Sequence, residues 1–220
     1  MKISQKTISL LENFQKINNG LVVDPGSVLS TVSPTGNIIA TANIDEEFPL
    51  QVCVYNLQEF LTVVNLFPDS ELDINEQKIT FKSSAGGATI VQSVPNLITN
   101  LSGKKIPSAE PIVSFTFPTT ALATIPKMQL TLPNVELLAD GELLRVRLLD
   151  LSNPSTTVLE FNVSETDKKF KAHLVSELFS KIQRSDSPYI VDVCNRFIVI
   201  SNVSLSVKYW LVLDSTSKFQ

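Results

Sequence analysis

The two halves of this 220-residue chain repeat one order of sequence features. At an offset of 117 residues, Leu57 matches Leu174, and the pair Asp69-Ser70 matches Asp186-Ser187. Each copy runs through a segment of helical periodicity, the Asp-Ser pair, an alternating strand, a polar turn and a second alternating strand. Identity between the copies is sparse, and two α+β halves could also share this order by accident. The repeat favours two similar domains, which the chain length permits.

Most of the chain has the residue pattern of short antiparallel strands. The segments Leu21–Val23 and Val28–Val32, for example, flank a turn that contains Pro25 and Gly26. Four segments instead have apolar residues at helical spacing. They are Thr7–Asn19, Leu57–Phe67, Leu174–Arg184 and, more weakly, Thr119–Ile125, which Pro126 closes. The pattern predicts an α+β fold of antiparallel sheets with a few helices.

One stretch near the middle of the chain lacks both periodicities. Ser93–Pro111 contains three prolines and the pair Lys104-Lys105. A connection of this length is unusual inside one compact domain. We therefore expect an N-terminal domain over residues 1–92, an interdomain linker over 93–111 and a C-terminal domain over 112–220.

The chain is poor in the groups that catalysis requires. It has one histidine, His173, and its two cysteines, Cys53 and Cys194, lie inside apolar runs typical of buried free thiols. One histidine and two distant cysteines cannot supply a tetrahedral zinc site, and the isolated Gly86-Gly87 pair is not a nucleotide-binding motif. We therefore predict no enzymatic activity, no catalytic residues, no metal and no cofactor.

The sequence also lacks the patterns of a membrane span and of a secretion signal. The longest apolar runs are strand-length, whereas a bilayer span needs about 20 apolar residues. Polar residues begin at once in the N-terminal segment Met1–Lys6, which lacks the continuous apolar core of a secretion signal. We expect no membrane association and a location in the cytoplasm.

The basic residues gather around the predicted helices, although the chain carries a net charge of −4. In or near those helices lie Lys2, Lys6, Lys16, Lys127, Lys168, Lys169, Lys171, Lys181 and Arg184. Acidic residues concentrate in turns and at sheet edges. If the helices share one face, an acidic protein would still present a basic surface. The alternative is that any solvated helix face collects lysine.

Four stretches of the sequence resemble a known family. The opening Met1–Ser4, the segment Asn13–Gly20, the junction Val54–Leu61 and the ending Leu213–Thr216 are similar to the DNA polymerase sliding clamps of T-even-type bacteriophages. The resemblance covers the whole length and is strongest over residues 1–75 and at the C-terminus. The chain departs from the family at Thr119–Ile125, where the family has a longer helix.

The resemblance implies a fold of two similar sliding-clamp domains, with antiparallel sheets outside and helices lining the interior of a ring. It implies a homotrimer around duplex DNA that binds without sequence specificity and slides. The partners implied are the replicative DNA polymerase, an ATP-dependent clamp loader and late-transcription factors, in the cytoplasm of the infected bacterial host. The cations that would then face DNA are Lys6, Lys16, Lys127, Lys171, Lys181 and Arg184.

The resemblance also implies an apolar pocket for partner peptides near the linker. Its candidate walls are Leu97, Ile98, Leu101, Tyr209, Trp210 and Leu211. Alternate residues of the last strand must face the core, so some of these side chains have a competing structural role. For the subunit contact we expect edge strands to pair, Ala88–Gln92 of one chain with Thr156–Phe161 of the next. The competing hypothesis for the whole chain is a non-enzymatic, β-rich structural protein of a virion or surface assembly.

Overall fold

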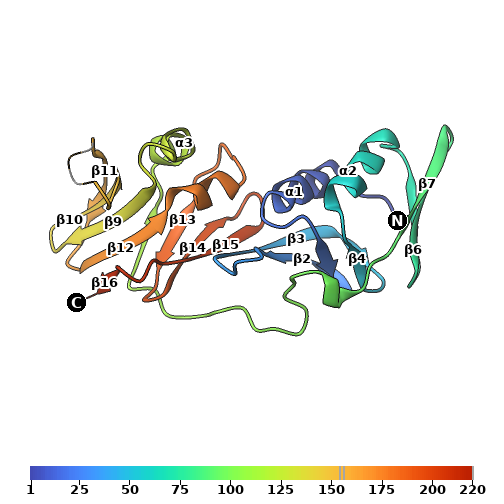
Figure 1. Ribbon diagram of the computed structural model, residues 1–220, viewed down its shortest axis with the longest axis horizontal. Coiled ribbons are helices and arrows are strands. Elements are labelled where there is room, and N and C mark those ends of the chain that lie inside the picture. The colour runs from blue at the N-terminus through green and yellow to red at the C-terminus, as the bar shows by residue number, and fades with distance from the viewer. Residues whose placement is uncertain (154, 156, 220) are drawn as a thin grey trace. The chain divides into compact units, whose positions relative to one another are not determined.

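The computed structural model divides the chain into two compact units, Met1–Pro107 and Ser108–Gln220 (Figure 1). It describes residues 1–153, 155 and 157–219. The division falls inside the segment 93–111 that the sequence marks as irregular. Each unit combines antiparallel sheets with short helices, which agrees with the predicted α+β class.

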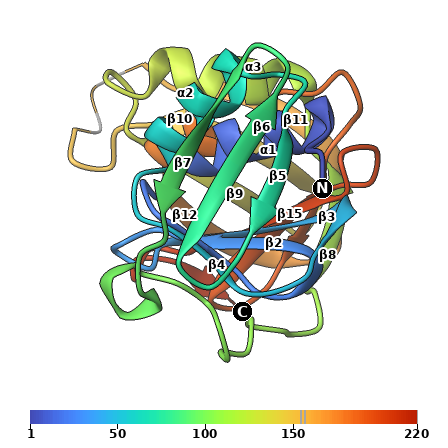
Figure 2. The ribbon, with the colours of Figure 1, turned by 90° about the vertical axis from the view of Figure 1, so that its right-hand side faces the viewer.

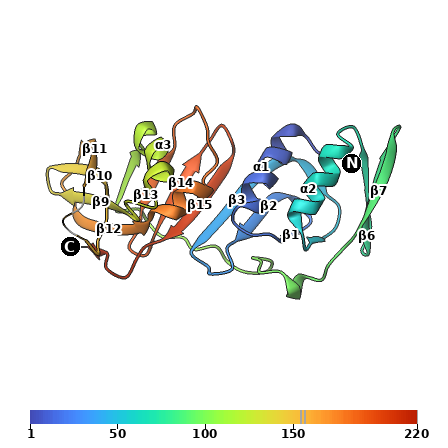
Figure 3. The same cartoon turned by 45° about the horizontal axis from the view of Figure 1, so that its top comes forward.

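The first unit contains two α-helices and three small sheets. Its elements in order are α1 (Gln5–Gln15), β1 (Leu21–Val23), β2 (Gly26–Val32), β3 (Ile38–Phe48), β4 (Val52–Val54), α2 (Leu57–Leu66), β5 (Glu71–Ile74), β6 (Lys78–Ser83), β7 (Gly86–Val91) and the 3₁₀ turn η1 (Pro95–Leu97). Strand β1 pairs with β4, β2 with β3, and β6 with both β5 and β7, all antiparallel. Helices α1 and α2 lie side by side over the sheets of this unit (Figure 3).

Side-chain caps set where the two helices begin. The Ser4 hydroxyl accepts from the Thr7 amide at 3.3 Å, so α1 starts at Gln5, two residues before the predicted Thr7. Asn56 caps α2 in the same way, with Oδ1 accepting from the Glu59 amide at 3.2 Å. Both helices bury one apolar stripe, and that of α1 includes the fully buried Phe14.

The sheet β5-β6-β7 ends in a strand that is exposed along most of its length. Figure 2 shows the three strands side by side, with β7 at one edge. Phe81 of β6 packs against Phe60 of α2 with ring centroids 5.6 Å apart, which fixes the sheet to the helices. On the β5 side, the amino group of Met1 donates to the Leu72 carbonyl at 2.8 Å, and the Leu72 amide donates to the Met1 carbonyl at 2.7 Å.

The second unit contains two larger sheets. Its elements are β8 (Val113–Thr116), α3 (Thr119–Met128), β9 (Asn134–Asp140), β10 (Leu143–Leu149), β11 (Leu159–Glu165), β12 (Lys169–Val175), the 3₁₀ helix η2 (Ser176–Lys181), β13 (Ile190–Val193), β14 (Phe197–Asn202), β15 (Val207–Val212) and β16 (Lys218–Phe219). Five strands pair in the order β11-β10-β9-β12-β16, and four in the order β15-β14-β13-β8. Helix α3 and η2 pack against each other.

The repeat seen in the sequence appears as a repeat of element order. The run β4-α2-β5-β6-β7 in the first unit corresponds to β12-η2-β13-β14-β15 in the second. In both runs the Asp-Ser pair, Asp69-Ser70 or Asp186-Ser187, precedes the first strand of the three. The helix of the first copy is thus replaced by a shorter 3₁₀ helix in the second.

Two helix predictions were wrong in extent. Residues 174–184 do not form an α-helix, because β12 extends to Val175 through its pairing with β9, and only Ser176–Lys181 turn helically. The apolar spacing that suggested a helix comes from Leu174, which is buried in the strand, Leu178 of η2 and Ile182 just after it, whereas Val175 is 44% exposed. Helix α3 is longer than predicted and continues through Pro126 to Met128. Pro126 has no N–H to donate to the carbonyl of Leu122, four residues earlier, and the helix ends two residues after it.

The predicted linker is anchored to the first unit over its N-terminal part. Ile98 is only 6% exposed and packs with Val22 and Cys53. The Asn18 side-chain amide donates to the Thr99 carbonyl at 2.8 Å, and the Ser102 hydroxyl donates to a carboxylate oxygen of Asp24 at 2.8 Å. These contacts hold a segment that sequence composition alone marks as irregular.

We predict that Ile98→Ala releases this segment. Removing the buried side chain should cost about 2 kcal/mol or more and should increase amide hydrogen exchange over residues 93–102. The matched control is Leu97→Ala, because Leu97 is 67% exposed and its loss should cost about 0.5 kcal/mol or less. Equal exchange in both variants would contradict the anchoring role of Ile98.

Candidate functional site

The N-terminal helix presents two of the predicted DNA-facing cations to solvent. Lys6 lies in the first turn of α1, and Lys16 is its C-terminal cap residue. Both side chains are exposed, on the side of the helix away from its buried stripe. The Lys16 position also suits the negative end of the helix dipole. Helix α2, by contrast, carries no cation, and its exposed residues are polar, acidic or apolar.

In the second unit, α3 and η2 bring three further cations together. Lys127 lies exposed in the last turn of α3, and Arg184 lies exposed just after η2. Lys181 ends η2, where its side chain forms an ion pair with Glu177 at 3.5 Å. Because α3 packs against η2, residues more than 50 positions apart in sequence share one region of this unit.

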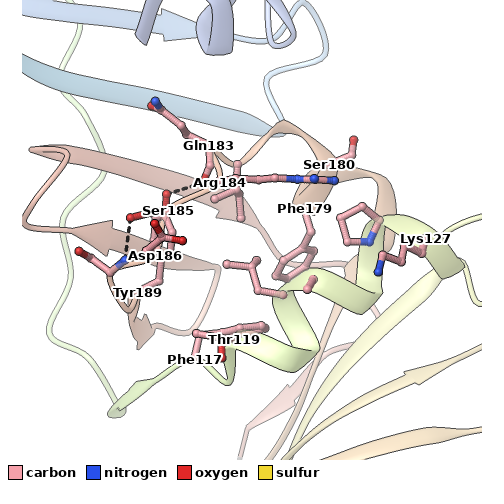
Figure 4. Close-up of a pocket in the computed structure, with 15 residues that line it drawn as sticks. Phe117, Thr119, Lys127, Phe179, Ser180, Gln183, Arg184, Ser185, Asp186 and Tyr189 are labelled. Carbon is pink, nitrogen blue, oxygen red and sulfur yellow. Dashed lines mark hydrogen bonds between the residues drawn. The ribbon is translucent and has the colours of Figure 1, made fainter. Parts of the chain in front are cut away.

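A cavity of about 610 Å³ separates α3 from the chain that follows η2. Figure 4 shows Lys127 and Arg184 reaching its rim from these two elements. Its floor includes Phe117 and Phe179, whose ring centroids lie 5.7 Å apart. Asp186 also lines the cavity, so the rim carries both charges. Lys127 and Arg184 at the rim are donors of the kind that bind phosphate oxygens.

Lys171 does not belong to this surface. The sequence placed it next to a helix, but it lies in β12, opposite Leu138 of β9. Its side chain points to the exposed face of the five-stranded sheet, because its neighbours Phe170 and Ala172 point into the core. The correction follows from the wrong helix prediction over Leu174–Arg184.

The partner-pocket residues of the linker are split between surface and interior. Leu97 lines a cavity of about 660 Å³ in the first unit and is exposed, whereas Ile98 also lines it but is buried. Leu101 is half-buried and lies outside the residues that line this cavity. Of these three side chains, Leu97 is the most accessible to a partner.

Two of the three pocket residues predicted on the last long strand are core residues. Tyr209 and Leu211 are fully buried, and the Tyr209 hydroxyl accepts from the Gln183 amide at 3.2 Å. Burial raises the pKa of Tyr209 well above its ordinary range. Trp210 points to the opposite face of β15 and is half-buried there, opposite Val199 of β14.

An apolar patch on this face was not found by sequence reasoning. Phe197 pairs with Val212 and Val199 with Trp210, so four apolar side chains adjoin on two neighbouring strands. Val212 is 48% exposed. The alternation of residues along the last long strand could have predicted this patch. It assigns Trp210 and Val212 to one face of the strand and Tyr209 and Leu211 to the other.

The one histidine belongs to a buried polar network. The His173 ring contacts Glu136 through Nε2 at 2.9 Å and Thr216 through Nδ1 at 2.8 Å. Arg147 donates to the other Glu136 oxygen at 2.5 Å. These hydrogen bonds and the Arg147 charge lower the pKa of Glu136 despite its burial. The network joins β9, β10 and β12 to the C-terminal segment.

Two features were not found within the described parts of the chain. Residues 1–153, 155 and 157–219 contain no group of three or more His, Cys, Asp or Glu side chains that could hold a metal ion. None of the helices described for this protein has the length and apolar character needed to cross a bilayer.

We predict that the Glu136 network makes stability depend on pH. A carboxyl whose folded pKa lies below its ordinary value of 4.5 stabilises the fold above that pH, and this contribution is lost as the pH falls through the folded pKa. Glu136→Gln should therefore lower the free energy of unfolding by about 1–3 kcal/mol at pH 7 and reduce its decline between pH 6 and pH 3. Urea unfolding at several pH values measures both effects.

The control for this experiment is Glu177→Gln, since the Glu177 side chain is 66% exposed in its ion pair with Lys181. It should change the unfolding free energy by less than about 0.5 kcal/mol. If Glu136→Gln retained the wild-type pH profile, the network would not be the source of the dependence.

The sequence is similar to those of sliding clamps from three bacteriophages. The chain is 29% identical over 236 residues to the sliding clamp of Vibrio phage KVP40, covering 98% of the chain and 100% of that protein. Over 69 residues, 31% of the chain and 30% of each relative, it is 38% identical to the sliding clamp of Escherichia phage RB69 and 36% identical to that of Enterobacteria phage T4. No family model matches the sequence.

Solved structures agree on the fold. The Archaeoglobus fulgidus PCNA bound to the C-terminal region of FEN-1 superposes with a TM-score of 0.70 at 14% identity, covering 96% of both chains. A putative DNA polymerase III beta subunit of Eubacterium rectale superposes with a TM-score of 0.74 at 12% identity, covering 98% of this chain and 64% of that one. The predicted two-domain sliding-clamp fold is confirmed.

The match along the whole sequence and the fold are those of sliding clamps, a class of processivity factors that are not enzymes. Its sequence likeness is to the clamps of T-even-type bacteriophages, as the four matching stretches predicted. The alternative of a virion or surface structural protein is not favoured.

Proposed function

We propose that this protein closes into a homotrimeric ring around duplex DNA and tethers the replicative DNA polymerase for processive synthesis. The observation that carries the proposal is the sliding-clamp fold together with a sequence match along the whole chain. In this role the chain needs no catalytic group. It holds DNA because the ring is closed, so that each contact with DNA can remain weak.

The DNA contacts we propose are Lys6, Lys16, Lys127, Lys181 and Arg184. All five lie on or next to α1, α3 and η2. Lys171 is omitted because it lies on a sheet face. Duplex DNA carries one negative charge per about 1.7 Å of axis, so a few cations from each chain suffice for a weak, salt-dependent interaction. Contacts to phosphate carry no sequence information, which permits sliding.

The proposal predicts that the double variant Lys127→Ala with Arg184→Ala shortens retention on circular DNA. Each lost phosphate contact should reduce the slope of log affinity against log salt by about 0.9. Retention of the loaded protein on nicked circular DNA, measured by gel filtration at several salt concentrations, tests this. Linearising the DNA should release wild-type protein, since a closed ring slides off a free end.

The matched control is Lys105→Ala with Lys208→Ala, which removes two exposed lysines that belong to none of α1, α3 and η2. It should leave retention unchanged. Equal retention on circular and linear DNA would overturn encirclement itself, whereas an unaffected Lys127/Arg184 variant would overturn only the assigned contacts.

For assembly, we propose that β7 of one chain pairs with β11 of the next. Both strands lie at a sheet edge, and β7 is mostly exposed, with Val91 at 79%. An unpaired edge is a template for pairing with another chain. Pairing two different edges is a head-to-tail contact, which closes into a ring when the rotation fits. Of the segment Thr156–Phe161 named from sequence, Thr156 lies outside the described residues.

Val91→Glu should therefore weaken the trimer, because it places a carboxylate on an apolar edge position that we expect the neighbouring chain to cover. Wild-type protein should elute as three chains of 24.2 kDa, about 73 kDa, and the variant should shift toward the monomer at micromolar concentration. Light scattering after gel filtration measures the mass. Val203→Glu is the control, since Val203 is 86% exposed in a turn of the second unit. A trimer in both variants would rule out this edge.

We further propose that partner peptides use Leu97 and Leu101 on the first unit, where Ile98 is a core residue. On the second unit, considered by itself, we propose Trp210 of β15 as the accessible residue, with Tyr209 and Leu211 acting as core residues. The partners are the polymerase, an ATP-dependent clamp loader and late-transcription factors, in the cytoplasm of the infected bacterial host. The exposure of Leu97 and the outward face of Trp210 support this choice of residues.

A further inference from the structure

A second surface of the C-terminal unit has the properties of a binding site. Strands β9, β12 and β16 lie side by side in its five-stranded sheet (Figure 1). On the exposed face of that sheet, their residues line a cavity of about 730 Å³. Its apolar wall includes Leu138 and Leu151, and three lysines, Lys169, Lys171 and Lys218, stand around it. Neither the proposed DNA contacts nor the linker pocket uses these residues.

The acidic residues of this cavity are already neutralised. Glu136 is bound by Arg147 at 2.5 Å, and Asp140 by Arg145 at 2.6 Å. The three lysines, in contrast, have no carboxylate within 4.0 Å among residues 1–153, 155 and 157–219. The site therefore retains a net positive charge that the protein itself does not compensate.

Two of these lysines are held in an unfavourable arrangement. Lys171 and Lys218 are direct cross-strand partners in the β12–β16 pair, and like charges in this position destabilise a sheet. Other contacts hold β16 in place against this repulsion. Phe219 stacks on Phe170 with centroids 5.6 Å apart, and the Ser217 hydroxyl accepts from the His173 amide at 2.9 Å.

We propose that this cavity binds an acidic peptide segment of a partner protein, with an apolar side chain of the peptide against Leu138 and Leu151. Carboxylates of the peptide would pair with Lys169, Lys171 and Lys218 and remove the repulsion between the last two. Nucleic acid would satisfy the lysines through phosphate but would leave the apolar wall uncovered, so the charge and the wall together favour a peptide. The inference does not depend on ring formation or on DNA binding.

The test is a fluorescence-anisotropy titration of the full chain with a labelled decapeptide of Asp and Glu residues around two leucines. We expect saturable binding that Lys171→Glu and Lys218→Glu each weaken by about fivefold or more. Lys105→Glu makes the same charge change on the first unit and should have no effect. Lys171→Glu should fold at least as well as wild type, because it turns a like-charge pair into an ion pair.

Replacing the two leucines of the peptide by alanine should also weaken binding, because the apolar wall would lose its partner. The proposal is overturned if the decapeptide does not bind, if Lys171→Glu and Lys105→Glu bind it equally, or if the alanine peptide binds as well as the leucine peptide. It is also overturned if a labelled single-stranded oligonucleotide shows the Lys171 and Lys218 dependence and the decapeptide does not.

Discussion

The alternation of buried and exposed side chains along the strands is the constraint on which the rest of this structure depends. In β12, Phe170, Ala172 and Leu174 enter the core, and Lys169 and Lys171 face solvent. A one-residue slip would move every cation into the interior and every apolar group to the surface. The register therefore fixes which side chains can meet DNA, a partner or another copy of the chain.

The polar network around His173 departs from this alternation, because two of its outward-facing side chains are buried. Glu136 and His173 lie on the outward face of the five-stranded sheet, yet both are buried because Arg147 and the C-terminal segment cover them. Each buried polar atom of this pair has a partner, which offsets the cost of removing it from water. The network thus fastens the C-terminal strand to the sheet, and that strand supplies Lys218 to the cavity described above.

In the proposed role, different parts of the protein hold DNA and recognise partners. The proposed DNA contacts are few and lie on or next to α1, α3 and η2; all but the half-buried Lys181 are exposed and form no ion pair among the described residues. Weak contacts of this kind permit movement along DNA, while a closed ring prevents dissociation. For the recognition of partners we propose the linker and Trp210 of β15 and, by our further inference, the exposed face of β9, β12 and β16.

The sequence alone determined the α+β class, the repeated element order and the position of the irregular central segment, because these depend on local periodicity and turn chemistry. It did not determine where the first helix begins, because the Ser4 cap lies ahead of the apolar spacing that marks the helix. Only the tertiary structure decided that Leu174 ends a strand instead of beginning a helix, because the ladder with β9 outweighs the helical spacing. Tertiary packing likewise buried Tyr209, exposed Trp210 and opposed Lys171 to Lys218, because these outcomes depend on strand pairing between residues far apart in the chain.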